Sequence, residues 1–153
     1  MISKRCKYGI KALLALAKRP LGEPVLIGDL ADQEKIPKKF LEVILLELKK
    51  KGILVSKKGK GGGYLLGSPP EAISLGRVIR ALDGPLAPLP CASVTRHRKC
   101  DDCESEVTCG LRTVMVQVRD ATAAVLDGTS LLDVVRYTLM QEELQKQVGN
   151  YVI

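Results

Sequence analysis

Four of the five cysteines of this chain lie in one stretch, CASVTRHRKCDDCESEVTCG, at residues 91–110. They are Cys91, Cys100, Cys103 and Cys109, with the spacing C-x8-C-x2-C-x5-C. Thiolates this near one another along the chain can converge on one metal centre at modest loop-closure cost. A closed set of four suits zinc, whereas iron–sulfur clusters accept cysteines at irregular spacing. A thiol–disulfide switch needs only two of them, so all three uses stay open.

The residues around these cysteines bear on their chemistry. A basic run, RHRK at 96–99, precedes Cys100, and nearby positive charge favours the thiolate and lowers a thiol pKa. His97 is the chain's only histidine. It is a possible further ligand, since imidazole can replace thiolate on iron, although a lone histidine in a basic loop is more often just solvated. The fifth cysteine, Cys6, is expected to pack as a small apolar residue.

The expected cellular setting argues against a structural disulfide. The apolar stretch from Ile10 to Ala17 is short and interrupted by Lys11, which does not suit a signal peptide. No run approaches the roughly 20 apolar residues of a membrane span. We therefore expect a cytoplasmic protein with no membrane partner, in which thiols stay reduced unless they bind metal or do redox work.

Charge is distributed unevenly along the 153 residues. Residues 1–68 hold 15 Lys and Arg against 6 Asp and Glu, whereas residues 69–153 hold 9 against 11. A net charge of +9 in the first part predicts a polyanion-binding module. With one histidine and no Ser-His-Asp or paired-carboxylate spacing, we do not expect an enzyme.

The first part also has a recognisable order of elements. Apolar periodicity predicts helices over about 4–18, 28–34 and 37–51, and ILVSKKGKGGGYLLG at 53–67 predicts a hairpin. The inward positions expected are Ile10, Leu13, Leu14 and Ala17 in the first helix, Leu30 and Ala31 in the second, and Leu41, Ile44, Leu45 and Leu48 in the third. Three helices followed by a basic hairpin are typical of a winged helix-turn-helix, so the predicted fold is mainly α with a small β-hairpin wing.

Double-stranded DNA is the expected partner of this unit. The N-terminal residues of a recognition helix reach base edges, and Glu42 could accept a hydrogen bond from a cytosine amino group. Wing lysines would lie along phosphates or enter the minor groove. The residues expected at DNA are Lys4, Lys7, Tyr8, Lys38, Lys39, Phe40, Glu42, Lys57, Lys58, Lys60, Gly62 and Tyr64. A scaffold that binds an acidic partner or RNA is the alternative from a different class.

The second part predicts a connecting helix over 74–82 and a long C-terminal helix. Leu111, Val114, Val118, Ala121 and Val125 fall at spacings of 3, 4, 3 and 4, as in an a/d seam. This favours a dimerisation helix over an ordinary buried helix, because helix-turn-helix proteins that bind two operator half-sites do so as two-fold symmetric dimers. A last helix is expected over 130–144. The expected organisation is a DNA-binding domain at 1–68, a connecting helix and linker at 69–90, a sensor loop at 91–110, dimerisation and final helices at 111–137, and a fraying tail at 138–153.

Taken together, residues 1–137 resemble the Rrf-two family of bacterial winged-helix regulators, which includes iron–sulfur cluster and nitric-oxide-sensing repressors. The likeness is carried by KYGIKALLALA at 7–17, IPKKFLEVILLELKKKGIL at 36–54, KKGKGGGYLLG at 57–67, ISLGRVIRALDG at 73–84 and the cysteine loop running into CGLRTVM. The resemblance implies a homodimeric repressor whose long helix, at about 106–127, crosses its partner. Each wing and recognition helix would then read half of a palindromic operator.

The resemblance also implies a metal centre. Many members hold a 2Fe–2S or 4Fe–4S cluster through three cysteines just before the long helix, and loss of the cluster changes DNA affinity. Their usual pattern is close to C-x5-C-x5-C, which Cys103 and Cys109 match at the last two positions. Cys91 is the natural first ligand, across a longer gap.

This chain departs from the family in its fourth ligand. Some members use a carboxylate just before the first-helix tyrosine, where this chain has Lys7. Others use a histidine three residues past the last cysteine, where it has Arg112. We therefore expect Cys100 to be the fourth ligand of an all-cysteine iron–sulfur site. A zinc site or a thiol switch in the same DNA-binding regulator is the alternative.

Overall fold

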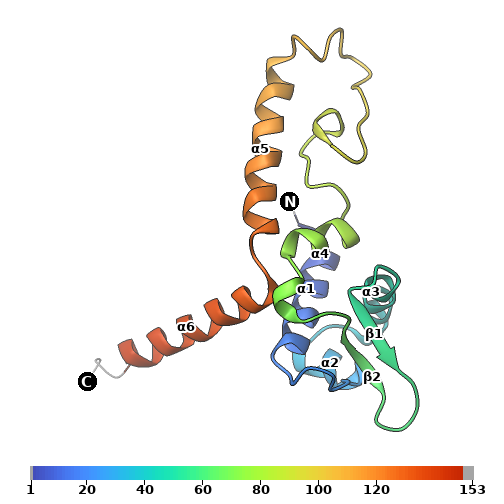
Figure 1. The fold of residues 1–153 in the computed structure, drawn as a ribbon, viewed down its shortest axis with the longest axis vertical. Helices are drawn as coiled ribbons and strands as arrows, with labels where there is room; N and C mark the ends of the chain where they lie inside the picture. Colours follow the sequence, from blue (N-terminus) through green and yellow to red (C-terminus); the bar gives the residue numbers. More distant parts are fainter. Residues whose placement is uncertain (1, 150–153) are drawn as a thin grey trace.

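The first part of the chain folds as three helices and a hairpin in the computed structural model, which describes residues 2–149. The elements are α1 Lys4–Ala17, α2 Ile27–Glu34, α3 Lys38–Lys50, β1 Leu54–Lys57 and β2 Gly63–Leu66. The two strands pair antiparallel, and α3 lies beside the hairpin at one edge of the molecule (Figure 1). This confirms the predicted fold class.

Helix α1 is the central helix of this unit, and it begins where the Ser3 side chain accepts a hydrogen bond of 3.0 Å from the Cys6 amide. It contacts α2, α3, α4 and α6. The predicted inward face of α1 is right only at Leu13, because Ile10, Leu14 and Ala17 are half-buried. The buried residues of α1 are Cys6, Gly9, Ala12, Leu13, Ala15 and Leu16. A Cβ at Gly9 would lie 2.4 Å from Leu82 Cδ1. Counting only large apolar residues missed this close approach.

The other two predicted faces of this unit are as expected. Leu30 and Ala31 of α2 are buried, and so are all four members of the α3 stripe. Pro37 caps α3 just before its first turn instead of standing inside it. Lys49 and Lys50 in the last turn of α3 complement its dipole.

The wing is fixed to the segment before α2. The Val25 amide donates to the Tyr64 carbonyl at 2.8 Å, and the Tyr64 amide donates to the Val25 carbonyl at 2.9 Å. Gly63 has a φ of 146°, and a Cβ there would lie 2.3 Å from the Val25 carbonyl oxygen. The Gly-Gly-Tyr motif thus lets the hairpin backbone approach Val25 as a third strand would.

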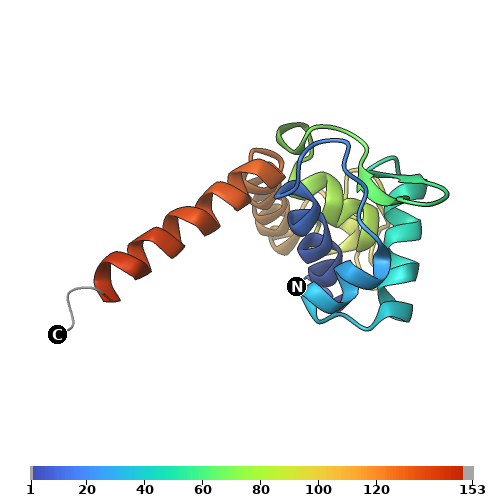
Figure 2. The same cartoon turned by 90° about the horizontal axis from the view of Figure 1, so that it is seen from below.

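The second part adds α4 Leu75–Leu82, α5 Gly110–Asp127, α6 Leu131–Gly149 and two short 3-10 turns, Pro70–Ala72 and Pro90–Ala92. The Ser74 hydroxyl caps α4 by accepting a hydrogen bond of 3.2 Å from the Arg77 amide. Helix α5 and the cysteine loop extend together away from the unit formed by α1 to β2, and α6 projects from the body in both views (Figures 1 and 2).

Two predicted helix bounds are wrong. Helix α5 begins at Gly110 instead of about 106, because the Cys109 side chain caps it by accepting from the Arg112 amide at 3.4 Å. Helix α6 continues to Gly149, past the expected end at Leu144 and through part of the expected tail. Residues 150–153 of that tail lie outside the described residues.

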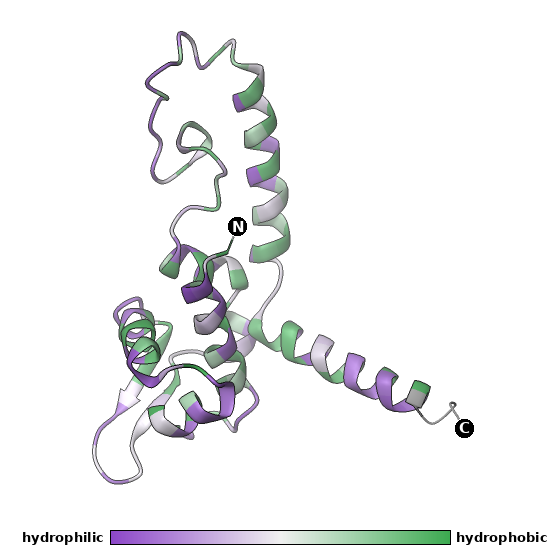
Figure 3. Ribbon diagram, turned by 180° about the vertical axis from the view of Figure 1, so that it is seen from behind, coloured by the Kyte–Doolittle hydropathy of each residue, from purple (hydrophilic) through white to green (hydrophobic). Residues whose placement is uncertain are grey.

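Helix α5 leaves its apolar residues uncovered. Within residues 2–149 it has no buried side chain, and hydrophobic residues recur along its length (Figure 3). The exposed fractions are 61% for Leu111, 50% for Val114, 43% for Val118 and 67% for Val125. The alternative of an ordinary buried helix is therefore wrong for the single chain. None of the helices within the described range combines the length and apolar character needed to cross a membrane.

Candidate nucleic-acid interface and thiol site

Helix α3 and the hairpin present the expected basic residues to solvent. On α3, Lys38, Lys39 and Glu42 are exposed. On the hairpin, Lys57 ends β1, and Lys58 and Lys60 lie in the turn, all three exposed. The ribbon places α3 and this turn on the same edge of the molecule (Figure 2). One edge therefore carries a helix and a wing with basic side chains.

Both flanks of α3 are anchored. On the wing side, Lys49 Nζ donates to Ser56 Oγ at 2.6 Å. On the α1 side, Arg5 pairs with Glu47. These contacts fix the orientation of α3 relative to both neighbours, which is a requirement for reading base edges.

Two of the three aromatic residues expected at DNA form a contact between α1 and α3. The rings of Tyr8 and Phe40 meet edge to face, with centroids 5.8 Å apart and planes at 83°. Lys4 Nζ lies 5.7 Å from the centroid of the Tyr8 ring. Lys4 and Lys7 are exposed on α1. The structure thus brings Lys4, Tyr8 and Phe40 together on one flank of α3.

Two further residues from the expected set have structural positions. Gly62 is buried, and a Cβ there would lie 2.4 Å from the Lys57 carbonyl oxygen. Tyr64 is partly buried and packs against the core. Gly62 and Tyr64 therefore build the hairpin that carries the lysines.

The four clustered cysteines line one open cavity of about 520 Å³ between the loop and the start of α5. Cys91 is buried, and Cys100, Cys103 and Cys109 are partly buried, all as free thiols. The remaining lining residues are Leu89, Asp102, Glu104, Ser105, Thr108, Leu111 and Arg112. The structure thus places every predicted metal ligand on one cavity.

The thiols do not form a closed ligand set. Within residues 2–149, no three side chains of His, Cys, Asp or Glu lie close enough together to hold a metal ion. The donors fit iron or zinc in their chemistry, but a metal would require the loop to draw inward. Hydrogen bonding with the Cys91 thiol, followed by desolvation, raises the pKa of Cys100. The expected lowering by the basic run is therefore wrong at Cys100.

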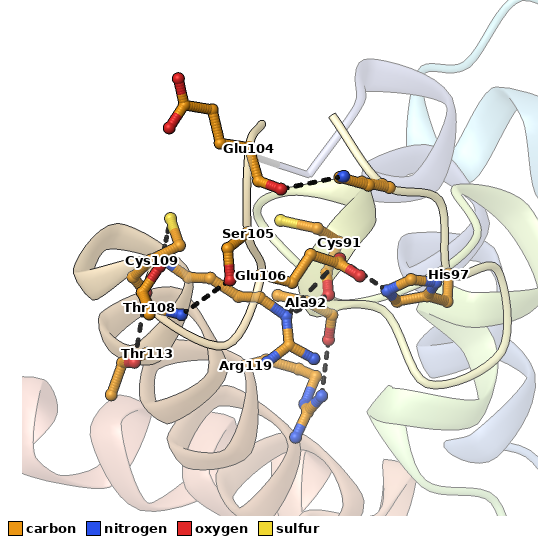
Figure 4. A network of polar contacts seen from close by, with 12 residues as sticks. Cys91, Ala92, His97, Glu104, Ser105, Glu106, Thr108, Cys109, Thr113 and Arg119 are labelled. Carbon is orange, nitrogen blue, oxygen red and sulfur yellow. Dashed lines mark hydrogen bonds and ion pairs between the residues drawn. The ribbon is translucent and has the colours of Figure 1, made fainter. Parts of the chain in front are cut away.

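Two arginines of α5 hold the beginning of the cysteine loop. Arg112 Nε donates to the Cys91 carbonyl at 3.1 Å, and Arg119 Nη1 donates to the Ala92 carbonyl at 2.5 Å (Figure 4). Sequence reasoning missed Arg119 altogether. The signal was the spacing of seven residues, which places both arginines on one face of a helix.

His97 lies against a carboxylate. Its Nε2 atom is 2.9 Å from Glu106 Oε1, and Arg112 Nε is 3.8 Å from the same oxygen. Glu106 is therefore the partner that the structure gives to His97, and sequence reasoning did not single it out. His97 does not line the thiol cavity.

Cys6 is apart from this site. It is 0% exposed in the core of the DNA-binding unit, which confirms the expected packing role. Desolvation by burial and the nearby Asp83 carboxylate raise the pKa of its thiol to about 12. Cys6 is thus an unreactive thiol at neutral pH.

A three-helix unit with an exposed, lysine-bearing third helix and a basic wing defines a winged-helix DNA-binding protein. The chain belongs to the Rrf2 family: the family model, described as an iron-dependent transcriptional regulator, matches residues 2–137. The resemblance seen in the sequence is confirmed, and the chain is a DNA-binding transcriptional regulator. The RNA-binding or scaffold alternative is set aside.

The relatives agree with this assignment. An rrf2-like HTH-type transcriptional regulator of Rhodobacter capsulatus is 40% identical over 136 residues, covering 87% of this chain and 91% of that protein. The HTH-type transcriptional regulator CymR of Bacillus subtilis is 32% identical over 142 residues, covering 93% and 94%. These relatives are regulators and not enzymes.

Solved structures share the fold. CymR, the global cysteine regulator of B. subtilis, aligns with a TM-score of 0.73 at 33% identity, covering 90% of this chain and 97% of that one. IscR of T. potens aligns at 0.69 with 26% identity, covering 90% and 88%. The oxidized form of CymR from Staphylococcus aureus aligns at 0.68 with 27% identity, covering 88% and 95%.

Proposed function

We propose that this protein is a dimeric cytoplasmic repressor whose affinity for a palindromic operator depends on an iron–sulfur cluster. Cys91, Cys100, Cys103 and Cys109 are the proposed ligands. The observation that carries the proposal is that all four free thiols line one cavity at the N-terminal end of α5, whose apolar residues are exposed. The family's description as iron-dependent supports the choice of metal.

The dimer is proposed from the exposed apolar seam of α5. A seam of alternating 3 and 4 spacing with about half of each large side chain in solvent suits a second copy of the same helix. A two-fold dimer presents two copies of α3 and the wing, which match two operator half-sites. The palindrome follows from that symmetry.

The loop and the dimer helix are coupled by hydrogen bonds from this chain's own residues. An iron–sulfur cluster, when bound, supplies a redox-active centre that holds thiolates together. Arg112 ties the Cys91 backbone to the first turns of α5, so closure of the loop around the cavity acts directly on that helix. Cys109, as the cap of α5, gives a second point at which the loop acts on the helix.

A thiol switch or a zinc site is the second candidate. The Cys91 thiol raises the pKa of Cys100 and both line the same cavity, which favours a switch because two nearby cysteines can form a disulfide. The existence of an oxidized form of S. aureus CymR is in keeping with this candidate. A zinc site would use the same four thiols as a closed tetrahedral set.

Metal content decides between these candidates. The protein should be purified without oxygen, and its visible spectrum, iron, acid-labile sulfide and zinc should be measured. We expect a coloured protein with iron and sulfide in stoichiometric amounts, and loss of both in the Cys103→Ser variant. The Cys6→Ala variant, altered only in the core thiol, serves as the matched control and should keep its colour. Stoichiometric zinc, or a colourless protein whose cysteine thiols are oxidised to a disulfide by peroxide and recovered by a reductant, would favour the second candidate.

A further inference from the structure

The outward face of α3 has an apolar centre. Lys39, Val43, Leu46 and Lys50 stand at i, i+4, i+7 and i+11, opposite the buried stripe of the same helix. Val43 is 59% exposed and Leu46 is 47% exposed, so neither serves the core. Two branched aliphatic side chains therefore stand in solvent at the middle of this face, with a lysine at each end.

The neighbouring side chains do not cover this pair. On one flank, Phe40 meets the Tyr8 ring and Glu47 pairs with Arg5. On the other flank, Lys49 is held by Ser56 of the hairpin. The side chains that could fold over the centre are thus committed to the two neighbouring elements.

The charge around the pair indicates what it meets. Lysines bracket Val43 and Leu46 along the helix, and the hairpin lysines lie at the same edge of the molecule. An apolar strip within a positive rim suits a polyanion that also offers apolar atoms. In the major groove of DNA, the apolar group that base edges offer is the C5-methyl of thymine.

We propose that Val43 and Leu46 read thymine through its methyl group. Three residues of α-helix rise about 4.5 Å, against about 3.4 Å between successive nucleotides of one strand. The two contacted thymines therefore lie within about two base pairs of each other in each half-site. The inference rests on the proposed function, in that α3 must enter the major groove of an operator.

The test begins with the full-length protein and a pool of random DNA duplexes. Rounds of binding and amplification yield the preferred half-site. Each thymine of that site is then replaced in turn by deoxyuridine, which keeps the base pair and lacks only the methyl group. For the unmodified protein, we expect affinity to fall about four-fold per contacted methyl, the value for burying one such group. The loss should be confined to one or two thymines per half-site.

Two variants and a control assign the effect to its residues. Val43→Ala should bind the thymine and deoxyuridine duplexes equally at one position, and Leu46→Ala should do so at the other. Leu21→Ala removes a 68% exposed leucine from the turn after α1 and should keep the full methyl dependence. Unchanged thermal unfolding of all three variants excludes misfolding as the cause.

The outcomes separate this inference from the proposed function. A pool that enriches no duplex overturns the proposed operator recognition and the thymine contacts together. An enriched site at which the unmodified protein ignores every deoxyuridine overturns the thymine contacts alone. Methyl dependence that survives in both Val43→Ala and Leu46→Ala also overturns the thymine contacts. If both variants bind the selected duplex as tightly as the unmodified protein does, this face of α3 serves a protein partner instead.

Discussion

The Nε atom of Arg112, in the first turn of α5, donates a hydrogen bond of 3.1 Å to the backbone carbonyl of Cys91. Two turns later, Arg119 holds the next carbonyl, that of Ala92. The first cysteine of the loop is thereby fixed to the helix whose apolar seam is uncovered. These two bonds are the contacts through which we propose that a change in the thiol cavity acts on α5.

Removing the Arg112 side chain should weaken metal binding. In Arg112→Ala, the Cys91 backbone loses its bond to α5, and residues that orient ligands typically contribute 10- to 100-fold to metal affinity. Competition with a chelator, for iron or zinc, measures the change. Arg136→Ala, which removes an exposed arginine from α6, is the control and should bind as the unmodified protein does. Equal affinities in both variants would show that the bond has no such role.

Alkylation should divide the cysteines into two groups. Burial raises the pKa of the Cys6 thiol to about 12, so at pH 8 it is almost wholly protonated as well as shielded. Metal-free protein treated with iodoacetamide should be labelled at the partly buried Cys103 and Cys109 first, and at Cys6 only after unfolding. Peptide mass spectrometry gives the order. Labelling of Cys6 as fast as Cys109 in folded protein would contradict the packing described.

A charge in the α5 seam should separate the subunits. Val118→Glu places a carboxylate in the middle of the proposed helix pair, where burial of an unpaired charge is costly. Sedimentation should show a dimer for the unmodified protein and a monomer for this variant. Gln117→Glu adds the same charge one residue away, at an exposed polar position, and should remain dimeric. If both variants sediment alike, the seam is not the interface.

The ion pair between α4 and α5 should make a small, pH-dependent contribution to stability. Arg80 binds Asp127 at 2.5 and 2.9 Å, and hydrogen bonding from Arg80 lowers the pKa of that carboxyl. A carboxyl whose pKa is lower in the folded state stabilises the fold above its unfolded pKa, near 3.9, and loses this effect as pH falls below it. Both side chains are more than a third exposed, so the contribution is at most about 1 kcal/mol.

Urea unfolding of Asp127→Asn tests this contribution. At pH 7 the variant should be less stable than the unmodified protein by that amount. At pH 3 the difference should shrink, since the carboxyl of the unfolded chain is then largely protonated and must lose its proton to form the ion pair. A difference that is the same at both pH values would assign the effect to something other than the charge.

The sequence was sufficient where large apolar residues set the pattern. The stripe of α3 from Leu41 to Leu48 is buried as predicted, because four branched side chains at helical spacing leave little choice of face. It was insufficient for α1, where Gly9 and Ala12 face the core. Small residues allow close helix packing, and their contribution is visible only once the neighbour is known.

The grouping of the four thiols was predictable from the sequence, whereas their contacts were not. Spacing alone brought the four cysteines together, and they share one cavity. The direction of the Cys100 pKa depends on a contact with Cys91, nine residues away, which local charge did not reveal. The contacts of Arg119 with Ala92 and of Glu106 with His97 join residues that are not neighbours in the sequence, so they are visible only in the folded loop. Val43 was not among the residues expected at DNA, because an exposed valine has no hydrogen-bonding group or charge that marks it as a base contact.

The most direct test of the central claim is the operator affinity of one anaerobic preparation measured with and without its metal. Fluorescence anisotropy on the selected duplex gives both values, and the Cys91→Ser, Cys100→Ser, Cys103→Ser, Cys109→Ser quadruple variant provides a permanently metal-free reference. We predict that removing the metal changes affinity at least about ten-fold, within the usual range for coupled sites, and that the quadruple variant matches the metal-free protein. Equal affinity with metal, without metal and in the quadruple variant would contradict the account.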